Sequence, residues 1–147
     1  MPEEIVIETA TASDITAVHR LEEAAFPQPW RREFFEGELH ASGRFNLVAK
    51  RYGRVIGYLF AMWIFDEMHV NKIAVEEAER RKGIAEALMG RCVGFAREHD
   101  IRSISLEVRK SNRGAQEFYK HLAFEPAYVR PQYYPDGEAA VVMTKIL

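Results

Sequence analysis

The stretch that decides the fold lies in the middle of the chain, at residues 73–86. It reads Ile73-Ala74-Val75, then an acidic turn, then Arg80-Arg81-Lys82-Gly83-Ile84-Ala85-Glu86. The first three residues end an apolar run of β type, and Gly83 opens a segment whose apolar residues have helical spacing. The first turn of a helix carries unpaired backbone N–H groups and partial positive charge from the helix dipole. We therefore expect an anion site at this strand-to-helix junction.

The residues of this junction favour a phosphate or a pyrophosphate as the anion. Gly83 lets the backbone approach a ligand with no Cβ atom in the way. Arg80, Arg81 and Lys82 add full positive charge beside the amides. The Walker pattern and the three-glycine dinucleotide pattern are both absent. The remaining pattern, Arg-x-x-Gly-x-Ala after a strand, also fits a charged turn that only caps a surface helix.

Composition and charge restrict the class of protein. The chain has 147 residues, enough to bury a sound core, and we expect a single domain over residues 1–147. It is 48% hydrophobic and 29% charged, which is typical of a globular protein and not of a disordered one. The net charge of −2 gives no reason to expect nucleic acid as a direct partner. The single cysteine excludes an internal disulfide framework.

No targeting, membrane or metal signal is evident in the sequence. The N-terminus, Met1-Pro2-Glu3-Glu4, lacks the basic-then-apolar layout of a signal peptide. The longest apolar run, from Val55 to Phe65, is too short to span a bilayer. The five histidines show no metal-ligand spacing, so we expect no metal. These features predict a cytoplasmic protein.

The periodicity of apolar residues predicts an α/β fold with a mixed central sheet and helices on its faces. The expected order is β-α-α-β-β-β-α-β-α-β-β, and the two β-α units predict parallel pairing near the middle of the sheet. The strand at 55–64 is nearly continuous in apolar residues, as expected for a strand covered on both faces. Strands are expected at 4–9, 45–51, 55–64, 67–75, 103–108, 127–130 and 139–145, and helices at 11–26, 30–39, 83–99 and 112–122.

A second informative stretch lies at the end of the strand at 103–108. Glu107 is an acidic residue in an otherwise apolar strand, which is costly if buried unless it has a partner or a function. Val108 should point to the opposite face of the sheet. If the helix at 112–122 returns antiparallel to this strand, Tyr119 reaches the mouth of the ligand site. Its helical spacing alone is also typical of a core tyrosine.

Together the two stretches resemble the GCN5-related N-acetyltransferases (GNAT). The motifs are Arg-x-x-Gly-x-Ala at 80–85 and Glu-Val-Arg-x-Ser-Asn-x-x-Ala-x-x-x-Tyr-x-x-x-x-Phe at 107–124. The resemblance covers nearly the whole chain and implies a single-domain GNAT fold with acetyl-CoA as co-substrate. The tail around Tyr133-Tyr134 resembles the branch that acetylates the N-terminal alanine of a ribosomal protein.

The resemblance also implies roles for individual residues. Glu107 would be the general base and Tyr119 the general acid in a direct attack of the amine on acetyl-CoA. Acetyl-CoA would be held by Ile73, Ala74, Val75, Arg81, Lys82, Gly83, Ile84, Ala85, Glu86 and Asn112. The acceptor peptide would be framed by Phe26, Trp30, Asp66, Glu67, Tyr133 and Tyr134. His69 either lines the same groove or is exposed to solvent, and Cys92 is expected in the core.

Three positions depart from the family pattern. Lys72 replaces a residue that is usually uncharged, and Ala139 replaces an acidic one, so both put the choice of acceptor in doubt. Ala123 replaces a glycine, which costs about 1 kcal/mol if that position is left-handed.

Two other functions stay open. The first is a lysine or small-amine acetyltransferase of the same family, which would need stronger deprotonation because lysine has a pKa of ~10.4. The second is a sensor that binds acetyl-CoA without turnover, although the presence of Glu107 speaks against it. The sequence identifies neither the acceptor nor the oligomeric state.

Overall fold

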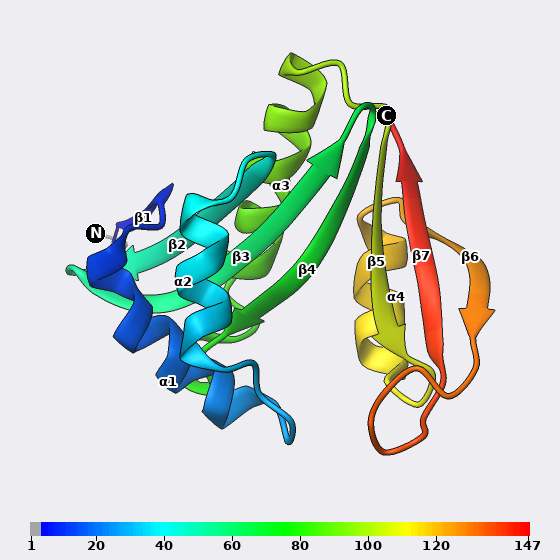
Figure 1. Ribbon diagram of the computed structural model, residues 1–147, viewed down its shortest axis with the longest axis horizontal. Coiled ribbons are helices and arrows are strands. Elements are labelled where there is room, and N and C mark those ends of the chain that lie inside the picture. Colours follow the sequence, from blue (N-terminus) through cyan, green and yellow to red (C-terminus); the bar gives the residue numbers. More distant parts are fainter. Residues whose placement is uncertain (1–3) are drawn as a thin grey trace.

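The structure, a computed structural model, describes residues 4–147 as a seven-stranded sheet with helices on both faces (Figure 1). Residues 1–3, which carry most of the acidic N-terminus, lie outside the described residues. The strands are β1 (Ile5–Thr9), β2 (Arg44–Arg51), β3 (Arg54–Ile64), β4 (Glu67–Val75), β5 (Ser103–Arg109), β6 (Glu125–Arg130) and β7 (Ala140–Ile146). The helices are α1 (Ile15–Ala25), α2 (Arg32–His40), α3 (Ile84–Glu98) and α4 (Arg113–His121), with short 3-10 turns η1 (Ala12–Asp14) and η2 (Glu77–Glu79).

The strand order is β1-β2-β3-β4-β5-β7-β6, and within the described residues only β4 and β5 pair in parallel. The mixed sheet and the order of elements confirm the predicted fold class. The expectation that both β-α units give parallel pairing is wrong for the second unit, because β7 is inserted between β5 and β6. The residues Ala140–Met143 of β7 are buried, whereas every residue of β6 is exposed, so β7 takes the inner place and β6 the edge.

Two hydrophobic clusters hold the helices on opposite faces of the sheet. One cluster joins the sheet to α3 and α4, and the other joins β2 and β3 to α1 and α2. Figure 1 shows α1 and α2 in front of β2–β4, with α3 behind them. Cys92 is fully buried in the first cluster, as predicted, and burial raises its pKa to about 12. No helix within residues 4–147 is long and apolar enough to cross a membrane.

A β-bulge in β4 changes which face its residues occupy. Phe60 of β3 pairs with Lys72 and Ala61 pairs with Val70, so Asn71 is the extra residue. Before the bulge, Val70 packs in the cluster with α3, and after it Ile73 packs there. Because side chains alternate along a strand, the bulge brings His69 and Lys72, three residues apart, to the face of α1 and α2.

Most element boundaries lie within two residues of the prediction. Trp30 and Arg31 precede α2 instead of opening it, so Trp30 belongs to the loop between α1 and α2. Ala123 follows α4 with φ +69°, which confirms that this family glycine position is left-handed.

Candidate active site

The site forms where β4 and β5 part. Within the described residues their pairing stops at His69 and Ser105, while β4 continues to Val75 and β5 to Arg109. In Figure 1 the two strands meet near the C-terminus and diverge toward their other ends. Ile73, Ala74 and Val75 lie on the diverging part of β4, beyond its pairing with β5, and the Val75 carbonyl accepts a hydrogen bond of 3.0 Å from the Arg80 Nε.

The predicted strand-to-helix junction lies at the end of β4. Gly83 has φ +83° and immediately precedes α3, whose first hydrogen bond runs from the Ala87 N–H to the Gly83 carbonyl. The earlier N–H groups of this turn are therefore left for a ligand. Beside them is a cavity of about 410 Å³. Its lining comprises Val75, Glu79, Arg80, Arg81, Gly83, Ile84, Ala85, Glu86, Phe118 and His121.

Six of the ten residues expected at the cofactor line this cavity, and the other four, Ile73, Ala74, Lys82 and Asn112, do not. Lys82 is half-exposed and pairs with Glu79 at 3.4 Å. Asn112 caps α4, where its Oδ1 accepts a hydrogen bond of 3.0 Å from the Ala115 N–H. Phe118 and His121 of α4 line the cavity but were not predicted. The sequence signal that could have identified them is their spacing of about one turn on a strongly amphipathic helix.

A polar cluster lies on the other side of the opening, around Glu107. Val108 packs in the core, which confirms that Glu107 points to the opposite face. The Glu107 Oε2 lies 2.5 Å from the His69 Nε2, and its Oε1 accepts a 3.0 Å hydrogen bond from the Tyr133 hydroxyl. The His69 Nδ1 lies 2.7 Å from the Asn71 Oδ1. His69 thus contacts Glu107, and 35% of its side chain is exposed.

The pair of His69 and Glu107 favours the ionised form of both groups. Burial disfavours charge on His69, but the hydrogen bond to Glu107 outweighs it and raises the pKa of His69. Burial likewise opposes ionisation of Glu107, but the hydrogen bonds from His69 and Tyr133 prevail and lower the pKa of Glu107. Glu107 is therefore a carboxylate at neutral pH.

Tyr119 lies on the opposite side of the sheet from Glu107. It is 8% exposed and packs edge-on against Phe118 and Phe124, with ring centroids 5.1 and 5.7 Å away. Burial raises the pKa of its hydroxyl, so Tyr119 stays protonated across the physiological range. Tyr119 belongs to the same hydrophobic cluster as Val108 of β5.

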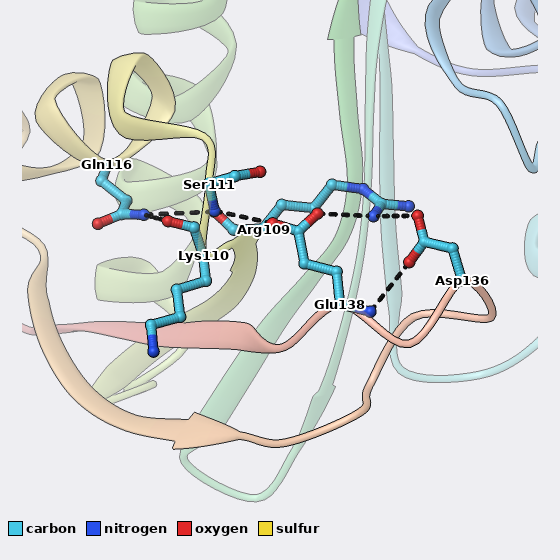
Figure 2. Close-up of polar contacts among 6 residues, drawn as sticks. All are labelled: Arg109, Lys110, Ser111, Gln116, Asp136 and Glu138. Carbon is cyan, nitrogen blue, oxygen red and sulfur yellow. Dashed lines mark hydrogen bonds and ion pairs between the residues drawn. The ribbon is translucent and has the colours of Figure 1, made fainter.

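The loop between β6 and β7 carries both predicted tyrosines and is fastened to β5 (Figure 2). The Arg109 guanidinium donates to Asp136 at 2.8 Å and to Glu138 at 2.9 Å, and it lies 4.1 Å from the ring centroid of Tyr134. Glu138 also accepts the Ser111 N–H at 2.8 Å. Hydrogen bonds from Ser111 and Arg109 lower the pKa of Glu138 to about 2. This network, which was not predicted, sets the position of Tyr133 over Glu107.

The loop between α1 and α2 lies across the same face. Phe26 and Trp30 both contact Lys72 of β4, on the face that carries His69. Asp66 and Glu67, in contrast, lie at the start of β4, where β4 and β5 are still paired. The Asp66 carbonyl accepts the N–H groups of Arg102 and Ser103 and so ties the turn to β5. Glu67 lies two residues before His69 on β4, and at about 3.3 Å per residue it is about 20 Å from Ile73.

No three His, Cys, Asp or Glu side chains in the described part of the chain are arranged to hold a metal ion.

Known proteins of one family resemble this chain in sequence. Residues 15–124 match the acetyltransferase (GNAT) family. The chain is 29% identical over 143 residues to the ribosomal protein bS18-alanine N-acetyltransferase of Escherichia coli (strain K12), covering 93% of this chain and 94% of the relative. It is 32% identical over 150 residues to an N-alpha-acetyltransferase of Sulfurisphaera tokodaii, covering 93% and 90%.

A solved structure extends the comparison to the fold. The crystal structure of the ribosomal-protein-S18-alanine N-acetyltransferase from Escherichia coli has a TM-score of 0.90 at 27% identity, covering 97% of this chain and 94% of that one. The family match spans the diverging strands, the loop at Gly83 and the strand that carries Glu107. The chain therefore belongs to the GNAT family and is an acetyl-CoA-dependent N-acetyltransferase.

Proposed function

We propose that this enzyme acetylates the α-amine of a protein N-terminus, and that the N-terminal alanine of a ribosomal protein is the first acceptor to test. The similarity to proteins named for these activities supports the proposal. The observation that carries it is the Glu107 carboxylate, paired with His69 and covered by Tyr133 at the opening between β4 and β5.

Glu107 is the general base in this proposal. An α-amine has a pKa of roughly 7.7–8.0, so part of it is already neutral near pH 7, and a base of lowered pKa is sufficient. Glu107 accepts the remaining proton, directly or through a water molecule. The same carboxylate is a poor base for lysine, whose pKa of ~10.4 demands a stronger one. An α-amine therefore needs less help from Glu107 than a lysine side chain does, because its own pKa is lower.

Tyr119 is the general acid. The neutral amine attacks the thioester directly, and coenzyme A leaves as a thiolate with a pKa near ~8.5, which needs little assistance. A protonated tyrosine on the α4 side of the opening suits late proton donation to that sulfur. No covalent enzyme intermediate is required.

The residues around the cavity suit acetyl-CoA, which supplies the thioester. The free N–H groups at Gly83, together with Arg81 and Lys82, suit its pyrophosphate. The backbone of Ile73, Ala74 and Val75 suits its acetyl and pantetheine end, and one of these N–H groups can stabilise the developing oxyanion. Asn112 would contribute to the acetyl-CoA site indirectly, because its side chain caps the start of α4.

The acceptor peptide is proposed to lie between two pairs of aromatic residues. Phe26 and Trp30 flank it on one side, and Tyr133 and Tyr134 flank it on the other. They come from the two loops that flank the face of His69 and Glu107. Aromatic loop residues on a rigid sheet suit the recognition of an extended peptide.

Mass spectrometry of acetyl transfer tests the proposed function. The substrates are alanine-starting ribosomal-type peptides and matched peptides with a blocked α-amine and a free lysine. A gain of one acetyl group on free α-amines alone is the expected result. Acetylation of the blocked peptides would move the function to lysine. Small amines are tested as acceptors as well. If the protein binds acetyl-CoA but releases no coenzyme A with any of these acceptors, it is a sensor.

A further inference from the structure

A lysine side chain lies beneath the loop that joins α1 and α2. The Lys72 Nζ lies 4.0 Å from the ring centroid of Phe26 and 5.3 Å from that of Trp30. Only 15% of the Lys72 side chain is exposed. A cation over aromatic faces is favourable, more so where it is partly withdrawn from water. Lys72 therefore occupies ring faces that an acceptor side chain would otherwise contact.

A buried carboxylate fixes the position of this ammonium. Glu22 of α1 is fully buried, and its Oε2 lies 2.9 Å from the Lys72 Nζ. The same oxygen accepts the Trp30 N–H at 2.9 Å, and the Oε1 accepts the Tyr58 hydroxyl. Moving Lys72 away would leave a buried charge without its counter-ion, which is costly.

The bulge at Asn71 sets the position of Lys72 relative to the proposed catalytic residues. Lys72 shares a face with His69 and directly precedes Ile73, where the proposed acetyl-binding backbone begins. Its stem thus runs from β4, beside the proposed acetyl-binding backbone, to the loop that carries Phe26. In the proposed function, the first side chain of the acceptor enters beside this stem.

We propose that Lys72 is a specificity-determining residue, which fills this space and restricts the first acceptor residue to a small side chain such as alanine. The proposal rests on the proposed function. A larger first residue would have to displace Lys72 from two aromatic rings and from Glu22. Exclusion by volume in such a pocket changes kcat/KM by about 10–200-fold per methylene-sized difference.

Two double variants separate volume from charge. Lys72→Ala alone would leave Glu22 unpaired and risks loss of folding, so Glu22→Gln accompanies each change. Glu22→Gln with Lys72→Met keeps the volume beneath the loop, and Glu22→Gln with Lys72→Ala removes it. The readout is the ratio of kcat/KM for matched peptides that begin with alanine or with leucine, together with acetyl-CoA affinity and circular dichroism.

The wild-type enzyme should prefer the alanine peptide by at least about tenfold. The Met variant should keep that ratio within about threefold, and the Ala variant should reduce it by about tenfold or more while binding acetyl-CoA normally. A folded Ala variant with the wild-type ratio would overturn the inference. So would a wild-type enzyme that acetylates both α-amines equally well, a result that needs no variant and leaves the proposed function intact. Acetylation of no α-amine at all would instead refute the proposed function, and the inference with it.

Discussion

The Nε2 of His69 lies 2.5 Å from the Oε2 of Glu107, so a side-chain ion pair joins β4 and β5 at their last backbone pair, that of His69 with Ser105. The two strands open at this point, and the carboxylate stands at the edge of the opening. A charged pair here both orients the base and marks the end of strand pairing.

Replacement of the base tests its role directly. Glu107→Gln keeps the shape of the side chain but removes the proton acceptor, so kcat should fall by about 10²–10⁴-fold. Acetyl-CoA affinity should not change, because the cavity at Gly83 does not include Glu107. Rapid-mixing measurement of coenzyme A release gives the rate, and calorimetry gives the affinity. Unchanged turnover would remove Glu107 from the mechanism.

Tyr119→Phe is the parallel test of the acid. It keeps the ring packing against Phe118 and Phe124, so its effect on turnover reports on the hydroxyl alone.

The ion pair also predicts a pH dependence of stability. The pKa of His69 is raised in the folded protein, so its contribution to the free energy of unfolding is complete below the unfolded value of about 6.5. That contribution is lost as pH rises through the folded pKa. The pKa of Glu107 is lowered, so its contribution is lost only in acid, as pH falls through its folded value.

Urea unfolding of the wild type and of His69→Gln at pH 6 and pH 9 measures the effect of His69. The variant should be less stable at pH 6, by about 1 kcal/mol or less because His69 is partly exposed, and the gap should narrow at pH 9. A gap that widens with pH would show that His69 is not the charged partner.

The parts of the fold and site that could be predicted from the sequence depend on residues that are close together in the chain. Gly83 and the basic residues before it mark a helix start, and this position depends only on neighbours in the chain. Alternation along β5 likewise placed Glu107 and Val108 on opposite faces without knowledge of the sheet order.

The features that were missed depend on distant parts of the chain. The insertion of β7 between β5 and β6 follows from which strand buries more apolar surface, which only the assembled sheet decides. In the sequence, Glu22 cannot be distinguished from the exposed polar residues of its helix. In the structure it is fully buried against Tyr58 and Lys72. The Asp66 carbonyl accepts the N–H groups of Arg102 and Ser103, which are distant in the sequence, and so ties the turn before β4 to β5.

Ala123 offers a test of backbone strain outside the site. It has φ +69°, and the next residue, Phe124, donates its N–H to the Tyr119 carbonyl at 2.9 Å, the bond that closes α4 in a Schellman motif. Ala123→Gly should therefore raise the free energy of unfolding by about 1 kcal/mol. Urea denaturation measures it, and an unchanged or lower midpoint would contradict the assigned conformation.

Gly83→Ala tests the anion site. A Cβ atom at Gly83 would meet nothing within 4 Å, so its cost comes from φ +83°, about 1 kcal/mol, and from the displaced amides at the start of α3. The KM for acetyl-CoA should rise several-fold. Gly90→Ala is the matched control, because it also meets nothing within 4 Å and lies within α3. Equal effects of the two changes on this KM would argue against a ligand at Gly83.

Arg109 should act on the acceptor and not on acetyl-CoA. It holds the β6–β7 loop through Asp136, Glu138 and the ring of Tyr134, and this loop places the Tyr133 hydroxyl on Glu107. Arg109→Met keeps the aliphatic stem but releases the loop, so the KM for the acceptor peptide should rise about tenfold or more, the loss expected for two charge-assisted hydrogen bonds.

Steady-state kinetics with each substrate varied in turn separates the two KM values. Arg102→Met is the matched control, since Arg102 is exposed and pairs with Asp66 at 4.0 Å at the other end of the sheet. If Arg109→Met instead raised the KM for acetyl-CoA and left that for the peptide unchanged, the β6–β7 loop would have no part in acceptor binding.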